Sequence, residues 1–289
     1  MITISPELIL TSIVAGILVG GLYAILALGA NLVVGVLRIV NLAHGAFVML
    51  GMFVTYWLYQ LYGVPPLLSL PISFCLSFVV GCLITLGIFK PLFGKEIALT
   101  VLASYGLQQA VINGAQVVWS GDYRKLPLSY GVFNYGPISV SGEYLVSFTL
   151  AVIFCVALYA FLKKTKLGKA MRAVNQDADA AATLGINVIR VRMINMGIGI
   201  GFAGIAGVVF SLVYYIYPYI GQMLGITALI VCVVGGLGDY LGTIIGALII
   251  GISQSLSILF LPYGLKDAVG FIVFLIILSL KPAGLFGKG

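Results

Sequence analysis

The chain has 289 residues, of which 62% are hydrophobic and only 8% are charged, and its mean hydropathy is +1.19. A soluble domain carries roughly a quarter charged residues, and its interior is too small to hide this much apolar surface. Lipid must therefore be the solvent for most of the chain. The net charge of +7 does not indicate a nucleic-acid partner, because the basic residues gather at the ends of apolar runs, as in membrane-protein loops.

Metal and cofactor chemistry is not expected either. The chain has four cysteines and one histidine. The cysteines all lie within apolar segments, and none forms a C-x-x-C pair. Cysteines in this setting act as small packing residues in helices. We therefore expect no metal site and no cofactor bound by this chain.

Apolar runs of about 20 residues, the length that crosses the hydrocarbon core, recur along the chain. They predict an all-α, polytopic membrane helix bundle of about eight or nine spans, in a single transmembrane domain over residues 1–289. The candidate spans cover residues 9–36, 42–62, 66–89, 97–119, 143–162, 193–217, 220–238, 240–261 and 267–280. The first run is longer than one crossing requires, and the Gly-Gly-Leu-Gly at 235–238 predicts broken or re-entrant helices.

A basic loop predicted at residues 163–192 sets the orientation. Its charged residues are Lys163, Lys164, Lys166, Lys169, Arg172, Arg190 and Arg192, against Asp177 and Asp179. Because Lys and Arg concentrate in cytoplasmic loops, this loop is expected in the cytoplasm, with the C-terminus on the same side. Alternation of the spans then places residues 120–142 and the N-terminus outside. The expected location is a bacterial-type inner (plasma) membrane, crossed several times.

Each half contains a glycine-bearing break. Residues 41–45 read Asn-Leu-Ala-His-Gly and lead to Gly51, and the break at 235–238 leads to a helix with glycines at 242, 246 and 251. Transporters are often built from repeated halves whose broken helices meet at the substrate path. The correspondence between the halves is therefore a hypothesis about the path.

Five segments together resemble the membrane subunits of branched-chain amino-acid ABC importers. They are the N-x-A-H-G stretch at 41–45, residues 165–173 (Thr-Lys-Leu-Gly-Lys-Ala-Met-Arg-Ala), residues 179–187 (Asp-Ala-Ala-Ala-Thr-Leu-Gly-Ile-Asn), residues 234–238 (Val-Gly-Gly-Leu-Gly) and residues 281–287 (Lys-Pro-Ala-Gly-Leu-Phe-Gly). They follow the family's order over nearly the whole chain. The resemblance implies a permease subunit that works with two cytosolic ATPase subunits, a second homologous permease subunit and an extracytoplasmic solute-binding protein.

The resemblance also implies a coupling helix. Asp179, Ala180, Ala181 and Gly185 match the E-A-A-x-x-x-G pattern of ABC permeases, with Asp in place of Glu. In that family the segment docks in a groove of the ATPase. The local chemistry agrees, because acids suit a helix start, alanines favour helix and glycine can end it. An ordinary solvated loop is the alternative.

ATP must come from a partner subunit. A P-loop requires G-x-x-x-x-G-K followed by Ser or Thr. Lys95, Lys169 and Lys288 each follow a glycine, but the next residues are Glu, Ala and Gly. This chain is therefore expected to be a transport channel subunit and not an enzyme.

Two groups of polar residues are candidates for the substrate path. Asn41 is expected to cap a helix that begins at the next residue, with His44 in its first turn, where free N–H groups suit a substrate carboxylate. The alternative is a buried pair that bonds neighbouring backbone groups. A polar stripe on one helical face forms the second group, with hydrogen bonding between helices as its alternative. It consists of Tyr105, Gln109, Asn113 and Gln116.

Weaker path candidates are Asn31, Asn195, Ser253, Gln254 and Ser257. A tyrosine cluster at 214–219 suits an aromatic belt at the membrane surface, or a docking surface for the binding protein. By family default the solute is an aliphatic amino acid, with urea, a short amide or another amino acid as alternatives. An intramembrane serine protease using Ser253 and His44 is a remote alternative. An ion channel is another, although no filter-like run lies inside the spans.

Overall fold

The computed structural model describes residues 5–37, 39–136 and 138–287. These ranges contain eleven α-helices and one short β-hairpin, which confirms the predicted all-α membrane bundle. The helices are α1 (Pro6–Leu37), α2 (His44–Tyr62), α3 (Pro66–Ile84), α4 (Ile97–Trp119), α5 (Gly142–Lys164), α6 (Lys166–Gln176), α7 (Ala178–Thr183), α8 (Val188–Val213), α9 (Ile220–Gly235), α10 (Tyr240–Ser257) and α11 (Lys266–Leu280). The hairpin pairs β1 (Val132–Tyr135) with β2 (Ile138–Ser141) in antiparallel register.

Short irregular turns extend two of the helices. A π-helical turn, Thr85–Phe89, and a 3-10 turn, Lys90–Leu92, continue α3. A second 3-10 turn, Tyr263–Leu265, precedes α11. With these turns counted, six segments of the described chain are long and apolar enough to cross a membrane. They are Pro6–Leu37, Pro66–Leu92, Gly142–Lys164, Val188–Val213, Tyr240–Ser257 and Tyr263–Leu280.

Three further helices, α2, α4 and α9, correspond to predicted spans but are not among these six segments. α9 is apolar but has only 16 residues, and α2 and α4 carry more polar side chains. α1 is one unbroken helix of 32 residues, about 48 Å long at 1.5 Å per residue. It therefore exceeds the roughly 30 Å hydrocarbon core, in agreement with the overlong first run.

The segment predicted as a loop at 163–192 is largely helical. It contains the end of α5, then α6 and α7, and the start of α8. α8 begins at Val188 because Asn187 caps it, its Oδ1 accepting from the Arg190 amide at 3.0 Å. Charged residues lower the hydropathy of this first turn, so the predicted span starts only at residue 193.

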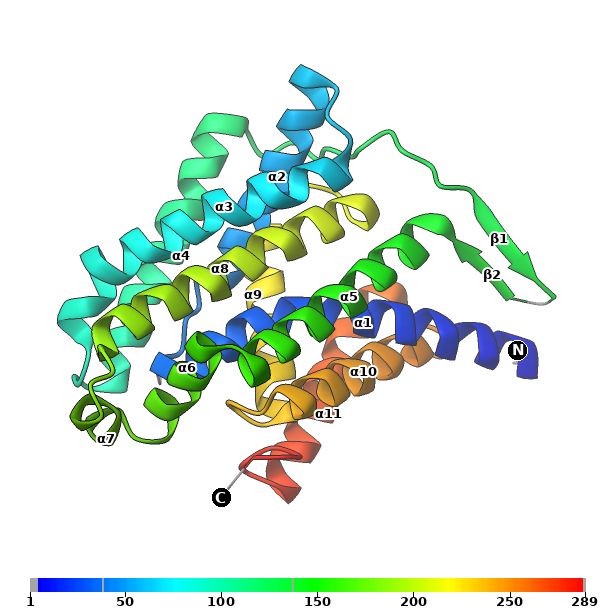
Figure 1. The fold of residues 1–289 in the computed structure, drawn as a ribbon. Helices are drawn as coiled ribbons and strands as arrows, with labels where there is room; N and C mark the ends of the chain where they lie inside the picture. Colours follow the sequence, from blue (N-terminus) through cyan, green and yellow to red (C-terminus); the bar gives the residue numbers. More distant parts are fainter. Residues whose placement is uncertain (1–4, 38, 137, 288–289) are drawn as a thin grey trace.

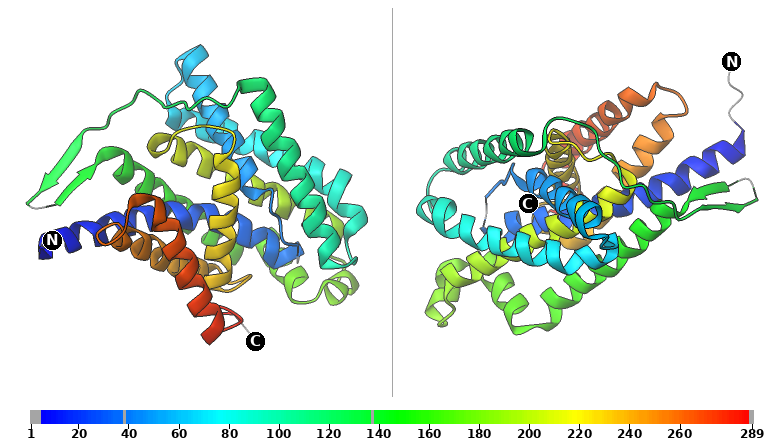
Figure 2. Two further views of the ribbon diagram at one scale, coloured as in Figure 1. Left: turned by 180° about the vertical axis from the view of Figure 1, so that it is seen from behind. Right: turned by 90° about the horizontal axis from the view of Figure 1, so that it is seen from above.

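α1 runs through the middle of the bundle, with α10 along one side and α8 along another, and α3 lies beyond α8 (Figures 1 and 2). The start of α1 and the β-hairpin lie at one end of the molecule, called here the hairpin end. α6 and α7 lie at the opposite end, called the α7 end (Figure 1). The long helices connect these two ends.

Glycine brings the central helices close enough for backbone contact. A Cβ atom added to Gly251 of α10 would lie 2.6 Å from the carbonyl oxygen of Gly16 and 2.6 Å from the amide of Gly20, both in α1. A Cβ on Gly51 of α2 would lie 2.6 Å from the carbonyl oxygen of Gly204 in α8. In lipid the hydrophobic effect does not drive helices together. Close packing at small residues stabilises these crossings instead.

Candidate functional site

The first break lies between α1 and α2, where residues 39–43 are not helical and end in a turn. Asn41 Oδ1 accepts from the Ala43 amide at 3.1 Å, so the side chain closes a turn outside the helix. α2 therefore begins at His44 with Ala43 as its N-cap, two positions after the predicted start. Ser104 of α4 holds the segment, since its Oγ lies 3.2 Å from both the Val40 carbonyl oxygen and the Leu42 amide.

His44 is a buried joint between α2 and α1. The side chain is 1% exposed, and its Nε2 lies 3.1 Å from the Leu26 carbonyl oxygen. Its Nδ1 is buried and has no hydrogen-bond partner. The amides of His44 and Ala46 already donate to Asn41 and Ala43. The chemistry offered at this point is thus one unpaired ring nitrogen, and not an open row of N–H donors.

α9 packs directly against the start of α2. A Cβ on Gly45 would lie 2.1 Å from the Gly221 carbonyl oxygen and 2.2 Å from the Gly225 amide. The two backbones are therefore in direct contact at this crossing. In this conformation a substrate carboxylate has no room at the first turn of α2, so the geometry favours the structural alternative for Asn41 and His44.

The second break, between α9 and α10, depends on glycine. Gly236 and Gly238 have φ values of 107° and 84°, which only glycine adopts without strain. Asp239 then caps α10, its Oδ1 accepting from the Gly242 amide at 2.7 Å. The predicted broken pair is therefore present, as two helices joined by a short turn.

Asn31 of α1 holds this second break. It is fully buried, and its Oδ1 accepts from the Gly238 amide at 2.7 Å. Its Nδ2 donates to the Asp239 carbonyl oxygen at 2.9 Å and to Thr243 Oγ1 at 2.6 Å. The sequence ranked Asn31 among the weaker candidates, although an amide inside a membrane span was the signal that could have raised its rank.

Both breaks thus attach to one stretch of α1. The Leu26 carbonyl oxygen contacts His44 Nε2 of the first break, and the Asn31 side chain accepts from the Gly238 amide of the second break. About one and a half helical turns separate these two points. The chain's last segment also reaches the second break, because the amides of Leu285 and Phe286 donate to the final carbonyls of α9. A movement of either break must therefore act on α1.

The polar stripe of α4 faces outward from the chain. Tyr105 is 47% exposed, and Asn113 is exposed with its Nδ2 on the Gln109 carbonyl oxygen at 2.8 Å. Gln116 Oε1 accepts from the Tyr219 hydroxyl at 2.8 Å. The face that α4 buries is a different one, made by Thr100, Ser104, Gln108, Ile112 and Ala115. The four predicted path residues therefore share a face, on which Tyr105 and Asn113 are exposed and Gln109 and Gln116 are half-buried.

α7 is a separate, capped helix at the α7 end. Asp177 Oδ1 accepts from the amides of Asp179 and Ala180, both at 2.9 Å. Gly185 follows the helix with φ 80°, and its amide donates to the Ala182 carbonyl oxygen at 3.0 Å. This is the acid-start, glycine-stop geometry predicted from the sequence.

The outer surface of α7 is free in this chain. Asp179, Ala180 and Gly185 are exposed, and the large apolar side chain of Leu184 is 81% exposed at the tip. The sequence predicted that Ala181 contacts the partner ATPase. In the structure this residue is only 2% exposed and packs inward. The surface that α7 presents thus has exposed carboxylates at its start and one protruding leucine at its end.

The groups required for serine proteolysis are bonded elsewhere. Ser253 Oγ donates to the Ile249 carbonyl oxygen at 2.7 Å in its own helix. The His44 ring bonds α1 through Nε2, and its Nδ1 has no partner. A serine nucleophile needs a hydrogen bond to its base, and these two side chains do not make one.

The fold and site define a polytopic α-helical membrane protein with two broken helices anchored on a central one and a capped helix protruding at one end. Residues 12–278 match the family described as the permease component of the branched-chain amino acid transport system, and the chain belongs to this family. It is therefore a transport subunit and not a catalytic enzyme. No solved structure matches the chain.

Relatives in this family cover almost the whole chain. The high-affinity branched-chain amino acid transport system permease protein BraD of Pseudomonas aeruginosa is 27% identical and covers 96% of both chains. The permease protein LivH of Escherichia coli, from a system of the same description, is 29% identical over 94% of both. LivM of Salmonella typhimurium, a permease protein of such a system too, is 25% identical over 91% of this chain and 67% of its own.

Proposed function

We propose that this chain forms one half of the membrane passage of an ABC importer for branched-chain aliphatic amino acids. The names of BraD and LivH support this solute class. ATP would be hydrolysed by two separate cytosolic ATPase subunits, and an extracytoplasmic binding protein would deliver the solute. A second permease subunit completes the passage, in keeping with the similarity to LivM.

The observation that carries the proposal is the free surface of α7. Its caps hold the helix in one shape without help from a partner, and Leu184 extends from it. A groove on the ATPase that buries this leucine would convert closure of the ATPase into a displacement of α7. Because α6 and α7 connect α5 directly to α8, the displacement would reach the helix that packs against α1. On this proposal the α7 end lies in the cytoplasm and the hairpin end outside.

The solute passage is proposed to lie between two permease subunits and not within one. The outward stripe on α4, which includes Gln109 and Asn113, supports this arrangement, because polar side chains inside a membrane face protein or water. The buried joint at His44 would then be a hinge of the passage. Its unpaired Nδ1 would gain a partner when α2 moves on α1.

Co-purification tests the α7 contact. The tagged chain is co-expressed with its ATPase, and the amount of ATPase recovered in mild detergent is measured. Leu184→Asp is expected to lower the recovery about tenfold or more, because a buried carboxylate at the contact has no partner. Leu61→Asp is the matched control, since Leu61 is 64% exposed on α2, away from α7. Equal recovery of ATPase with Leu184→Asp and wild type would show that α7 is not the contact.

Solute choice needs a second experiment. The binding protein of the same system is titrated with leucine, urea and short amides, and uptake is measured in proteoliposomes. Leucine, isoleucine or valine should bind and be taken up with ATP. Binding of urea or an amide alone would establish the alternative solute while leaving the α7 contact intact.

A further inference from the structure

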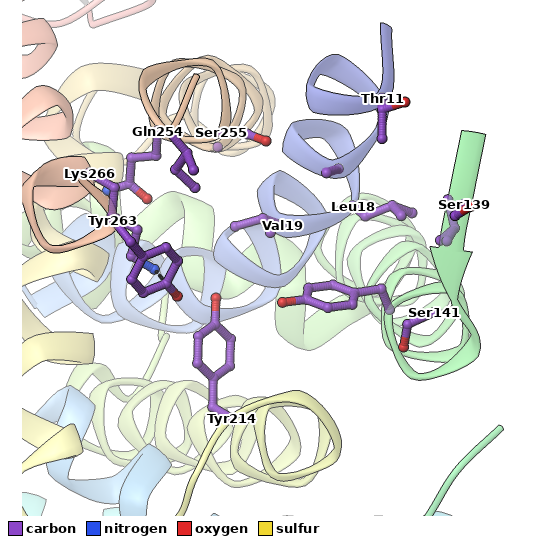
Figure 3. Close-up of a pocket in the computed structure, with 15 residues that line it drawn as sticks. Thr11, Leu18, Val19, Ser139, Ser141, Tyr214, Gln254, Ser255, Tyr263 and Lys266 are labelled. Atoms are coloured by element: carbon purple, nitrogen blue, oxygen red, sulfur yellow. Dashed lines mark hydrogen bonds between the residues drawn. The ribbon is translucent and has the colours of Figure 1, made fainter. Parts of the chain in front are cut away.

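A cavity of about 320 Å³ lies at the hairpin end, between α1, α10, the start of α5 and the start of α11 (Figure 3). One part of its wall is polar and the other is hydrocarbon. The polar part includes Ser141, Tyr144, Tyr214, Tyr263 and Lys266, and the apolar part includes Leu18, Val19 and Ile258. None of these residues belongs to the breaks, the α4 stripe or α7.

Lys266 supplies a buried positive charge to the polar part. Its side chain is only 9% exposed. Its Nζ donates to the Tyr263 hydroxyl at 3.1 Å and lies 4.6 Å and 5.9 Å from the ring centres of Tyr263 and Tyr214. Within the described ranges no carboxylate oxygen lies within 4.0 Å of this nitrogen. The ammonium group thus has aromatic and hydroxyl neighbours but no counter-ion among the residues that the structure describes.

The neighbouring acid, Asp267, is bonded to a different side chain. It accepts from Gln254 Nε2 at 3.3 Å and lines a separate cavity among α9, α10 and α11. Gln254 Oε1 in turn accepts from the Tyr23 hydroxyl at 2.8 Å. The Asp267 carboxylate is therefore bonded to α10 and not to the lysine.

Two tyrosine hydroxyl groups lie near the lysine. In Figure 3, Tyr214 and Tyr263 extend from different elements toward the same region, beside the Lys266 side chain. Ser141 and Ser255 line other parts of the cavity, and the Ser141 hydroxyl donates to the Glu143 carboxylate. An ammonium with two hydroxyl donors is a set that binds an anionic oxygen group, because charge-assisted hydrogen bonds are the strong ones.

Exposed apolar side chains also lie in the first turns of α1, ahead of the residues of α1 that line the cavity. Leu8 and Leu10, in the first turns of α1, are 44% and 47% exposed. Ile258 at the end of α10 is exposed as well as lining the cavity. The occupant must therefore combine an anionic head with an apolar body that extends into the bilayer.

We propose that this cavity binds the headgroup of an anionic phospholipid, with the phosphate at Lys266 and an acyl chain along the exposed face of α1. A free amino acid fits less well, because its ammonium group would meet Lys266 and no lining carboxylate. Free phosphate would leave the wall of Leu18, Val19 and Ile258 without a partner. The site joins α1, α5, α10 and α11, so an occupied cavity would tie the hairpin ends of these helices together.

Lipid retention measured by native mass spectrometry tests the proposal. The purified chain is titrated in detergent with phosphatidylglycerol and with phosphatidylcholine of the same acyl chains. Wild type should bind phosphatidylglycerol at least about tenfold more tightly, and Lys266→Met should remove that preference. Lys266→Arg should keep it, because the charge remains. Tyr263→Phe should weaken phosphatidylglycerol binding severalfold while leaving the lysine in place.

Lys163 provides the matched control. It makes the same kind of pair, with its Nζ 3.3 Å from the Tyr159 hydroxyl and 5.4 Å from that ring, but it is exposed. Lys163→Met should leave the preference unchanged. Equal binding of the two lipids by wild type, or an equal loss from both lysine variants, would overturn the proposal. Displacement of the lipid by millimolar phosphate or leucine would overturn it too, in favour of a soluble anion or an amino acid.

Discussion

Replacing Asn31 with alanine removes three hydrogen bonds at once from the second break. The side chain accepts from the Gly238 amide and donates to the Asp239 carbonyl and the Thr243 hydroxyl. Side-chain hydrogen bonds in membrane proteins contribute about 0.6 kcal/mol each on average. Three of them give about 2 kcal/mol, and the half-buried Gly238 amide left without an acceptor costs about 1–3 kcal/mol more. We expect Asn31→Ala to lower the free energy of unfolding by about 3–5 kcal/mol.

Asn195 offers a control of the same residue type and burial. It is also fully buried, but it makes one bond, from Nδ2 to the Leu32 carbonyl oxygen at 3.0 Å, and its Oδ1 has no partner. Asn195→Ala should therefore cost about 1 kcal/mol. The assay is SDS-induced unfolding in mixed micelles, followed by circular dichroism. Equal losses from the two variants would refute the reasoning, because burial alone would then account for them.

Two further predictions concern helix contacts and the α4 stripe. Gly45→Ala should destabilise the protein by about 1–3 kcal/mol through overpacking against α9, measured by thermal unfolding in detergent, whereas Gly106→Ala, with nothing within 4 Å of the new Cβ, should be neutral or stabilising. In a cysteine-free background, cysteines at Gln109 and Asn113 should react with water-soluble thiol reagents in the assembled transporter, while one at the exposed, apolar Leu102 should not. Failure of both stripe positions to react, with the control behaving as expected, would place the stripe against protein or lipid.

Much of the local structure follows from residues close in sequence. α7 illustrates this, because its start is set by Asp177 bonding amides two and three residues ahead, and its end by Gly185 in a left-handed conformation. The second break follows in the same way from Gly236 and Gly238. The errors in local structure lie at boundaries where charged or polar residues begin a helix, such as the start of α8 at Val188, and in α6, which forms within the segment predicted as a loop.

The direction in which polar side chains face did not follow from the sequence. The α4 stripe is a true helical face, but periodicity cannot say whether that face meets this chain, a second chain or lipid. Ala181 was likewise grouped with its neighbours, and only the packing of α7 places it inward. The sequence does not single out Lys266, because a lysine beside an apolar span is ordinary and its aromatic neighbours come from other elements.

The sequence by itself determined the lipid environment, the helical class, the two breaks and the ends of α7, because these depend on composition and on bonds that close within a few residues. Only the tertiary structure decided that Asn31 and His44 secure the two breaks on α1, and that Lys266 and Tyr214 share a cavity. The partners of Asn31 lie more than 200 positions away in the chain. In lipid, a buried polar group bonds to whichever helix lies beside it, and that neighbour is set by glycine contacts throughout the bundle.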